Sequence, residues 1–137
     1  MKRIKMNQHE SRRVAMQAVY LANQDLKYTP AEVEAKTVAM LDLKELSAYS
    51  KTLIEGVIEK RDELKGQLAS YLKKNWRIDR IDQISLAILE IALFEIKYSD
   101  EIEPKAAVNE ALNLCDEFAD PKTKPFINGI LANFIQK

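Results

Sequence analysis

Apolar positions recur at helical spacing along most of the chain, so the sequence predicts consecutive helices. Between residues 10 and 24 the apolar residues fall on one face, and a second stripe runs through Leu46, Tyr49, Leu53 and Val57. Only three glycines and a surplus of Ala, Leu, Ile, Glu and Lys also favour helix over sheet. We therefore expect an all-helical chain.

Local signals mark several helix boundaries. Thr29 followed by Pro30, with Glu32 three residues after the threonine, is a strong start signal: an N-cap, a proline at the first helical position and a capping glutamate. Pro104 similarly predicts the first position of a later helix. Asp62 as an N-cap favours a break between two helices there, although an apolar stripe continues beyond it and nothing else requires the break.

The segment 84–96 is apolar nearly all round, with only Ser85, Glu90 and Glu95 polar. A helix of this kind packs against neighbours on several sides. A buried strand could show the same pattern over five or six residues, but thirteen residues without glycine or proline favour a helix. We expect this segment to be the central helix.

Two helix-period segments near the C-terminus each carry an asparagine beside apolar residues, Asn109 and Asn128. Because a buried amide costs stability unless a partner satisfies it, these residues suggest a fixed helix crossing or a site. A loop from residue 120 to residue 125 should separate the two segments. Gly129 inside the second should cost about 1 kcal/mol relative to alanine, so we expect a close backbone approach there.

The formal net charge of the 137-residue chain is zero, but the charges are unevenly distributed. Residues 1–13 hold five basic residues and one acidic residue, a net +4, so the remaining chain carries −4. Such asymmetry fits either a polyanionic partner or a solvated tail. We expect residues 1–9 to form a flexible basic arm and residues 10–137 to form a single domain.

No catalytic or metal site is evident in the sequence. His9, the only histidine, falls in the expected arm, and Cys115, the only cysteine, fits a small core residue better than a nucleophile. The three glycines stand too far apart for a phosphate-binding loop, and nothing selects a catalytic pair among the many carboxylates. The sequence therefore favours a protein that is not an enzyme and needs no cofactor or metal.

The expected compartment is the cytoplasm. A single cysteine excludes an internal disulfide and fits a reducing environment. No segment is apolar for long enough to span a bilayer, and the N-terminus lacks the apolar core of a secretory signal. We therefore expect no membrane partner.

Four motifs resemble the NusB family of bacterial transcription antitermination factors, in the same order and at similar spacing. They are Arg12–Tyr20, Asn75–Ile81 followed by Ala87–Glu95, Ala107–Ala111 and Phe126–Leu131. The resemblance runs from about Glu10 to Phe134 and is weakest between residues 25 and 60. It implies an all-α fold of about seven helices in two packed small helical bundles.

The resemblance also implies a function. Members of this family bind boxA-type single-stranded RNA of ribosomal RNA leaders together with NusE, a ribosomal small-subunit protein that doubles as a Nus factor. The pair joins the RNA polymerase elongation complex with other Nus factors and suppresses premature termination. The resemblance implies no catalysis.

Candidate contact residues follow from the chemistry of RNA and from the resemblance. Single-stranded RNA is usually held by cations along its phosphates and by aromatic rings that stack on its bases. Phe126 would either stack on a base or anchor the last helix in the core, and the resemblance slightly favours RNA contact. The resemblance indicates Tyr20, Gln24 and Ser85 as contacts of NusE. Without the resemblance, Tyr20 would be expected to pack against the core, as an aromatic residue in the middle of a helix usually does. The candidate RNA-binding cations are Lys2, Arg3, Lys5, Arg12, Arg13, Lys122 and Lys124.

The chain departs from the family pattern at four positions. Family members often carry an acidic residue at the positions of Ser85 and Lys122, arginine at that of Glu90 and lysine at that of Pro125. Lys122 would strengthen phosphate contact, but the details of NusE docking do not transfer.

These departures and the neutral net charge motivate two alternatives to RNA binding in antitermination. The first is an interaction scaffold of NusB-like fold, monomeric or homodimeric, without strong RNA binding. The second is a detached binding module of an RNA-modifying enzyme, because NusB-like domains also precede cytosine methyltransferase domains.

Overall fold

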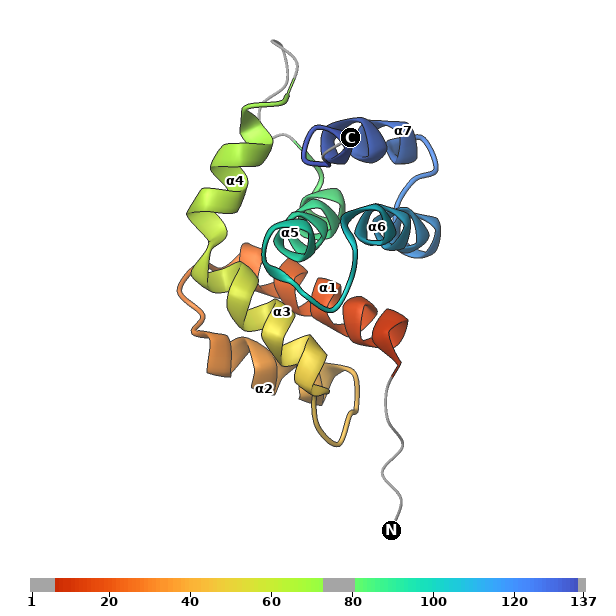
Figure 1. Cartoon of the computed structure of the whole chain (residues 1–137). Helices are drawn as coiled ribbons and strands as arrows, with labels where there is room; N and C mark the ends of the chain where they lie inside the picture. Colours follow the sequence, from red (N-terminus) through yellow and green to blue (C-terminus); the bar gives the residue numbers. More distant parts are fainter. Residues whose placement is uncertain (1–6, 73–80, 136–137) are drawn as a thin grey trace.

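Seven α-helices make up most of the chain that the computed structural model describes, residues 7–72 and 81–135 (Figure 1). No strand occurs in these two ranges, so the all-α prediction is confirmed. The helices are α1 (Gln8–Gln24), α2 (Pro30–Met40), α3 (Ala48–Glu59), α4 (Arg61–Ala69), α5 (Gln83–Tyr98), α6 (Pro104–Phe118) and α7 (Thr123–Ala132).

The helices form two groups that meet at α1 and α5. In the first group α1, α2 and α3 pack against one another, and in the second α5, α6 and α7 do so (Figure 1). Helices α1 and α3 pack on α5 and thereby join the groups, while α4 continues from α3 and also lies against α5. This arrangement confirms the prediction of two packed small bundles.

Helix α5 is the centre of the fold because neighbours cover it on several sides. Every residue from Ser85 to Glu95 is buried, against α1, α3, α4, α6 and α7. Burial of a run of Leu and Ile side chains on all faces supplies much of the hydrophobic stabilisation. The sequence-based prediction of a central helix over 84–96 is therefore confirmed.

The predicted helix starts also hold, with one adjustment. Thr29 and Glu32 form a full capping box at α2, and Pro104 occupies the first turn of α6. The predicted break is present, but it falls at Lys60, and Asp62 lies in the first turn of α4 rather than at its N-cap. In that turn its negative charge still interacts favourably with the helix dipole.

Two expectations about the C-terminal helices are wrong. Asn109 and Asn128 are exposed, so neither amide marks a buried helix crossing, while a role of either in a site stays a prediction. Within the described chain, a Cβ added at Gly129 would meet no heavy atom within 4 Å, so no described backbone segment approaches it closely. The last helix begins at Thr123, earlier than expected, because Pro125 is tolerated in a first turn whose N–H groups have no helical partner.

The start of α1 also differs from the expected arm. The helix begins at Gln8, because the Asn7 side chain accepts a hydrogen bond from the Glu10 N–H at 2.8 Å and acts as the N-cap. The Asn7 amide in turn donates to the Glu10 carboxylate at 3.0 Å. His9 therefore belongs to the helix and not to a preceding arm.

Candidate nucleic-acid interface

The exposed side of α1 carries Arg13, Tyr20 and Gln24. Their spacing of seven and then four residues places them along one face of the helix. Tyr20 is 39% exposed, and the Gln24 amide donates to the Tyr20 carbonyl oxygen at 3.4 Å. Both side chains thus lie at the surface, and their role as contacts of a protein partner stays a prediction.

Arg12 does not lie on that side, so its expected place among the solvent-facing cations is wrong. The residue is only 2% exposed, and its Nε donates to both carboxylate oxygens of Glu95, at 3.1 and 2.9 Å. Its Nη1 lies 3.6 Å from a carboxylate oxygen of Glu110. A phosphate contact by Arg12 would require breaking a buried ion pair, so we no longer count it as an RNA-binding residue.

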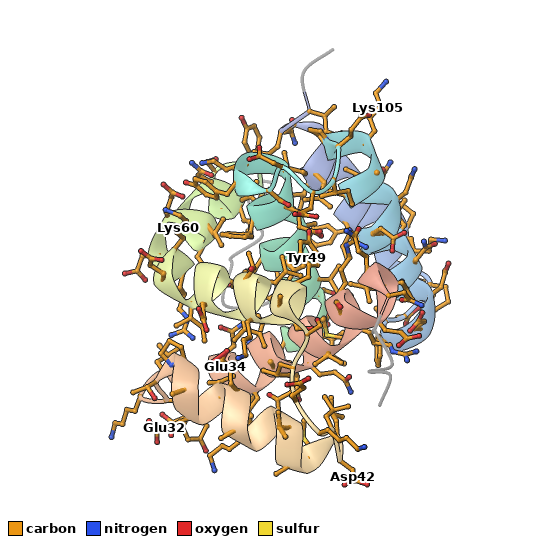
Figure 2. The ribbon with its side chains drawn as sticks, turned by 60° about the horizontal axis from the view of Figure 1, so that its bottom comes forward. Glu32, Glu34, Asp42, Tyr49, Lys60 and Lys105 are labelled. Atoms are coloured by element: carbon orange, nitrogen blue, oxygen red, sulfur yellow. The ribbon has the colours of Figure 1, made fainter. Side chains whose placement is uncertain are left out.

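Tyr49 completes the buried cluster around Glu95. Its hydroxyl donates to Glu95, and Figure 2 shows it near the middle of the molecule, on α3. Burial raises the pKa of Glu95, whereas the Tyr49 hydrogen bond and the Arg12 guanidinium oppose that rise. Burial and the bond to Glu95 raise the pKa of Tyr49 itself to about 12, so it stays a donor. The cluster fixes α1 against α3 and α5.

His9 lies between two carboxylates of α6, a contact that the sequence did not indicate. Its Nδ1 is 3.1 Å from Glu110 Oε2, and its Nε2 is 2.5 Å from Glu117 Oε1. Hydrogen bonds to Glu110 and then to Glu117 raise the pKa of His9. The one signal available in the sequence was Asn7 with Glu10 three residues later, a capping pattern that would have placed His9 on the helix.

The structure brings the two predicted cationic groups together at the last turn of α6. Arg13 Nη1 lies 3.5 Å from Glu117 Oε2, and Lys124 Nζ lies 2.9 Å from Asp116 Oδ1. Because Asp116 and Glu117 are adjacent, the cation of α1 and that of α7 meet on neighbouring residues. Sequence reasoning found both cations but missed the acids that pair with them.

The start of α7 carries the remaining described candidates. Lys122 is exposed at the N-cap position, where its backbone N–H donates to Asp120 at 2.9 Å. Phe126 is partly buried and packs against the hydrophobic core. Core anchoring thus describes part of its role, and base stacking by its remaining surface stays a prediction.

Ser85 was expected near the surface that binds NusE, but it is buried. Its hydroxyl donates to Asp82 Oδ2 at 2.7 Å, and its backbone N–H donates to Asp82 Oδ1 at 2.8 Å. The side chain therefore serves the N-terminal cap of α5. Any partner at this end of α5 would meet the exposed Asp82 and not Ser85.

The other predicted cations and part of one motif lie outside the described residues. Lys2, Arg3 and Lys5 lie outside the described residues, as does Asn75–Arg80, the first part of the second resembling motif. Of the stretch from Asn75 to Ile81 only Ile81 is described, and it is buried, whereas the second part of the motif, Ala87–Glu95, lies in the buried helix α5.

No group of three or more His, Cys, Asp and Glu side chains among the described residues could hold a metal ion. Cys115 is buried, and burial raises the pKa of its thiol to about 11, which fits the predicted core role. None of the described helices has the length and apolar character needed to cross a membrane.

The fold and the surface where α1, α6 and α7 meet define an all-helical binding protein. The model of the NusB family matches residues 9–136, nearly the whole chain. The chain therefore belongs to the NusB family, as the four sequence motifs indicated. This membership makes it a binding factor and not an enzyme.

Close relatives of known identity cover almost the full length. The transcription antitermination proteins NusB of Latilactobacillus sakei and Lacticaseibacillus casei are 37% and 38% identical to this chain, each over 95% of it and over 96% and 95% of their own lengths. NusB of Clostridium botulinum is 32% identical over 95% of this chain and its own full length.

Solved structures share the fold at lower identity. NusB of T. maritima superposes with a TM-score of 0.82 at 19% identity, covering 96% of this chain and 92% of that chain. A chain from the structure of the antitermination factors NusB and NusE in complex with double-stranded RNA gives a TM-score of 0.78 at 22% identity, covering 94% and 97%. At these identities the likeness establishes the fold.

Proposed function

We propose that this protein is a transcription antitermination factor that binds boxA-type single-stranded RNA of ribosomal RNA leaders together with NusE. The pair would join the RNA polymerase elongation complex with other Nus factors, in the cytoplasm. The family match over residues 9–136 supports this role most directly. The relatives named NusB and the related structure that holds NusB, NusE and RNA support it further.

The surface has a physical basis for RNA contact. Arg13 and Lys124 lie on either side of the last turn of α6, with Lys122 exposed close by in the chain. A flexible polyanion can cross such a surface if its phosphates displace Glu117 and Asp116 from the two cations. Because that displacement offsets part of the attraction, we expect weak binding by the chain alone and tighter binding when NusE supplies further contacts.

The test is a binding titration of labelled boxA RNA with and without NusE at several salt concentrations. The logarithm of the binding constant should fall with the logarithm of the salt concentration, with a slope of about −0.7 per phosphate neutralised. Replacing Arg13 and Lys124 with alanine should weaken binding and flatten that slope by about one to two units.

Lys105→Ala provides the matched control. Lys105 is an exposed lysine at the start of α6, twelve residues from Glu117 and so roughly 18 Å along the helix axis, and Figure 2 shows it at the rim of the molecule. Its loss should leave the slope unchanged. An Arg13→Ala, Lys124→Ala variant with the wild-type slope would remove these two residues from the RNA contact.

One observation favours the alternative of an interaction scaffold. Arg13 and Lys124 are each already paired with a carboxylate, so this described surface carries no strong excess of positive charge. A scaffold would retain a protein partner from lysate after RNase treatment and would leave boxA RNA unbound even when NusE is present. That pair of results would replace the RNA-binding proposal.

A further inference from the structure

Each of the two ring nitrogens of His9 faces a carboxyl group. When it is ionised, a carboxylate accepts hydrogen bonds and cannot donate one. Nδ1 lies 3.1 Å from Glu110 Oε2 and Nε2 lies 2.5 Å from Glu117 Oε1. A neutral imidazole has one N–H and one bare nitrogen, so it could satisfy one carboxylate and would turn a lone pair toward the other. Only the imidazolium, with an N–H on each side, satisfies both carboxylates.

This contact joins segments far apart in the sequence. Glu110 and Glu117 lie seven residues apart, on one side of α6, and His9 lies in the first turn of α1. The chain enters α1 at Asn7, directly after the basic residues at positions 2, 3 and 5. The imidazolium therefore docks the beginning of α1, and the point from which the basic segment leaves it, on α6.

The same carboxylates contact the neighbouring arginines. Glu117 also pairs with Arg13, at 3.5 Å, and Glu110 lies 3.6 Å from Arg12, which itself binds Glu95 of α5. Asn113 of α6 donates to the other oxygen of Glu110 at 3.5 Å. Three cations, counting His9, thus balance three carboxylates.

Loss of the His9 proton changes that balance. The cluster would then carry a net charge of −1 immediately beside Arg13, which would repel phosphate, and the dock on α6 would be weakened at the same time. Both effects act in the same direction, against a bound polyanion.

We propose that protonated His9 is a positioning residue for RNA binding: it docks the start of α1 on α6 and neutralises the carboxylates that would otherwise repel phosphate from Arg13. This inference rests on the proposed function. RNA affinity should therefore depend on pH. The contact holds the pKa of His9 above its usual value of 6.5, so the dock is complete below that pH and is lost as the pH rises through the raised pKa.

The test combines a titration with binding measurements. His9 is the only histidine, so its ring gives a single assignable NMR resonance in the intact protein. That resonance should titrate above pH 6.5, and Glu117→Gln should move its titration to lower pH. Binding of boxA RNA with NusE present is then measured from pH 6 to pH 9 for wild type, His9→Gln and His9→Arg.

The wild type should bind about three- to tenfold more weakly at pH 9 than at pH 6, as expected for one partly screened charge. His9→Gln should bind RNA weakly at every pH from 6 to 9. Any pH dependence of its affinity that remains would come from the terminal amine and from NusE. His9→Arg, with a permanent charge and a fork of donors, should keep its affinity at pH 9.

Two results would overturn the inference: His9→Gln that matches wild type at pH 6, or a wild-type pH dependence no steeper than that of His9→Gln. Absence of RNA binding by the wild type at every pH would instead overturn the proposed function and, with it, the positioning of RNA by His9. The NMR titration decides separately whether His9 docks on the two carboxylates.

Discussion

Replacing Arg12 with methionine removes the cation from the buried pair with Glu95. The two side chains are 3% and 1% exposed, and Arg12 Nε reaches both oxygens of Glu95 at 3.1 and 2.9 Å. Methionine is long, flexible and uncharged, so it fills much of the vacated space. Glu95 would then keep only the Tyr49 hydroxyl as a described donor.

The expected loss follows from an uncompensated buried charge. Removing one partner of a buried ion pair typically costs about 3 to 5 kcal/mol. Because the Tyr49 hydroxyl still donates to Glu95, we expect the lower end, about 3 kcal/mol of the free energy of unfolding at pH 7. For a protein with a stability of about 5 to 15 kcal/mol, the variant should still fold.

The loss should also depend on pH. Burial already raises the pKa of Glu95, and without the opposing guanidinium it should rise further. A carboxyl whose pKa is higher in the folded than in the unfolded state opposes folding once it ionises. The deficit of Arg12→Met should therefore be largest at neutral pH and should shrink as the pH falls through the folded pKa.

Urea unfolding followed by circular dichroism at pH 7 and at pH 5 measures this free energy. Adding Glu95→Gln to Arg12→Met removes the charge and should recover most of the loss at pH 7. Arg13→Met, which breaks an exposed pair with a 44% exposed arginine side chain, is the control and should cost less than about 1 kcal/mol. A double variant as unstable as Arg12→Met would refute the reasoning, because the unpaired charge would then not be the cause.

Three further predictions test other parts of the structure. Gly56→Ala should lower the free energy of unfolding by about 1 to 3 kcal/mol, because a Cβ there would lie 2.2 Å from the Phe94 ring. Gly129→Ala, in open space, should raise the free energy of unfolding by up to about 1 kcal/mol. Denaturant melts that show Gly56→Ala to be more stable than Gly129→Ala would contradict this. Cys115, with a buried thiol of pKa about 11, should react with a thiol reagent at pH 8 only after unfolding, and rapid reaction of the native protein would exclude the core role. Burial raises the pKa of Glu90, so Glu90→Gln should add about 1 kcal/mol of stability at pH 7 but little at pH 4.5, and an equal gain at both pH values would contradict that cause.

The helices could be predicted because their signals are local. Two of these signals lie within one helical turn: the capping box of Thr29 and Glu32 and the proline at position 104. The third, the apolar segment 84–96, spans about four turns. The same holds for the break near Lys60, which a possible N-cap indicated to within two residues. Local backbone preferences and periodicity determine such features without knowledge of the packing partners.

The side-chain partners could not be predicted because they come from distant residues. Arg12 stands at the edge of the apolar stripe of α1. Its guanidinium is buried because α5 packs there and places Glu95, 83 residues later in the sequence, beside it. His9 depends likewise on Glu110 and Glu117, more than 100 residues away. A single sequence contains no measure of these distances, so a surface cation and a buried one look the same.

The sequence also does not reveal which glycine allows another helix to approach the backbone closely. Gly129 was expected to allow a close approach because it interrupts a helix, yet the approach occurs at Gly56, where the Phe94 ring of α5 lies against α3. Both glycines stand inside predicted helices and carry the same local cost. The packing of α3 on α5 distinguishes them.

Asp116 and Glu117 connect the packing of the site to its proposed chemistry. Acidic residues in the last turn of a helix are unfavourable to the helix dipole, so local helix stability does not explain their presence at the end of α6. Their pairing with Lys124 and Arg13 does, since it holds cations of α7 and α1 in place before any ligand arrives. Ordered cations lose less side-chain entropy on binding, but phosphate must first displace the carboxylates. If the proposed function holds, the paired cations are correctly placed for RNA but bind it weakly, and a second RNA-binding protein would have to supply the remaining contacts.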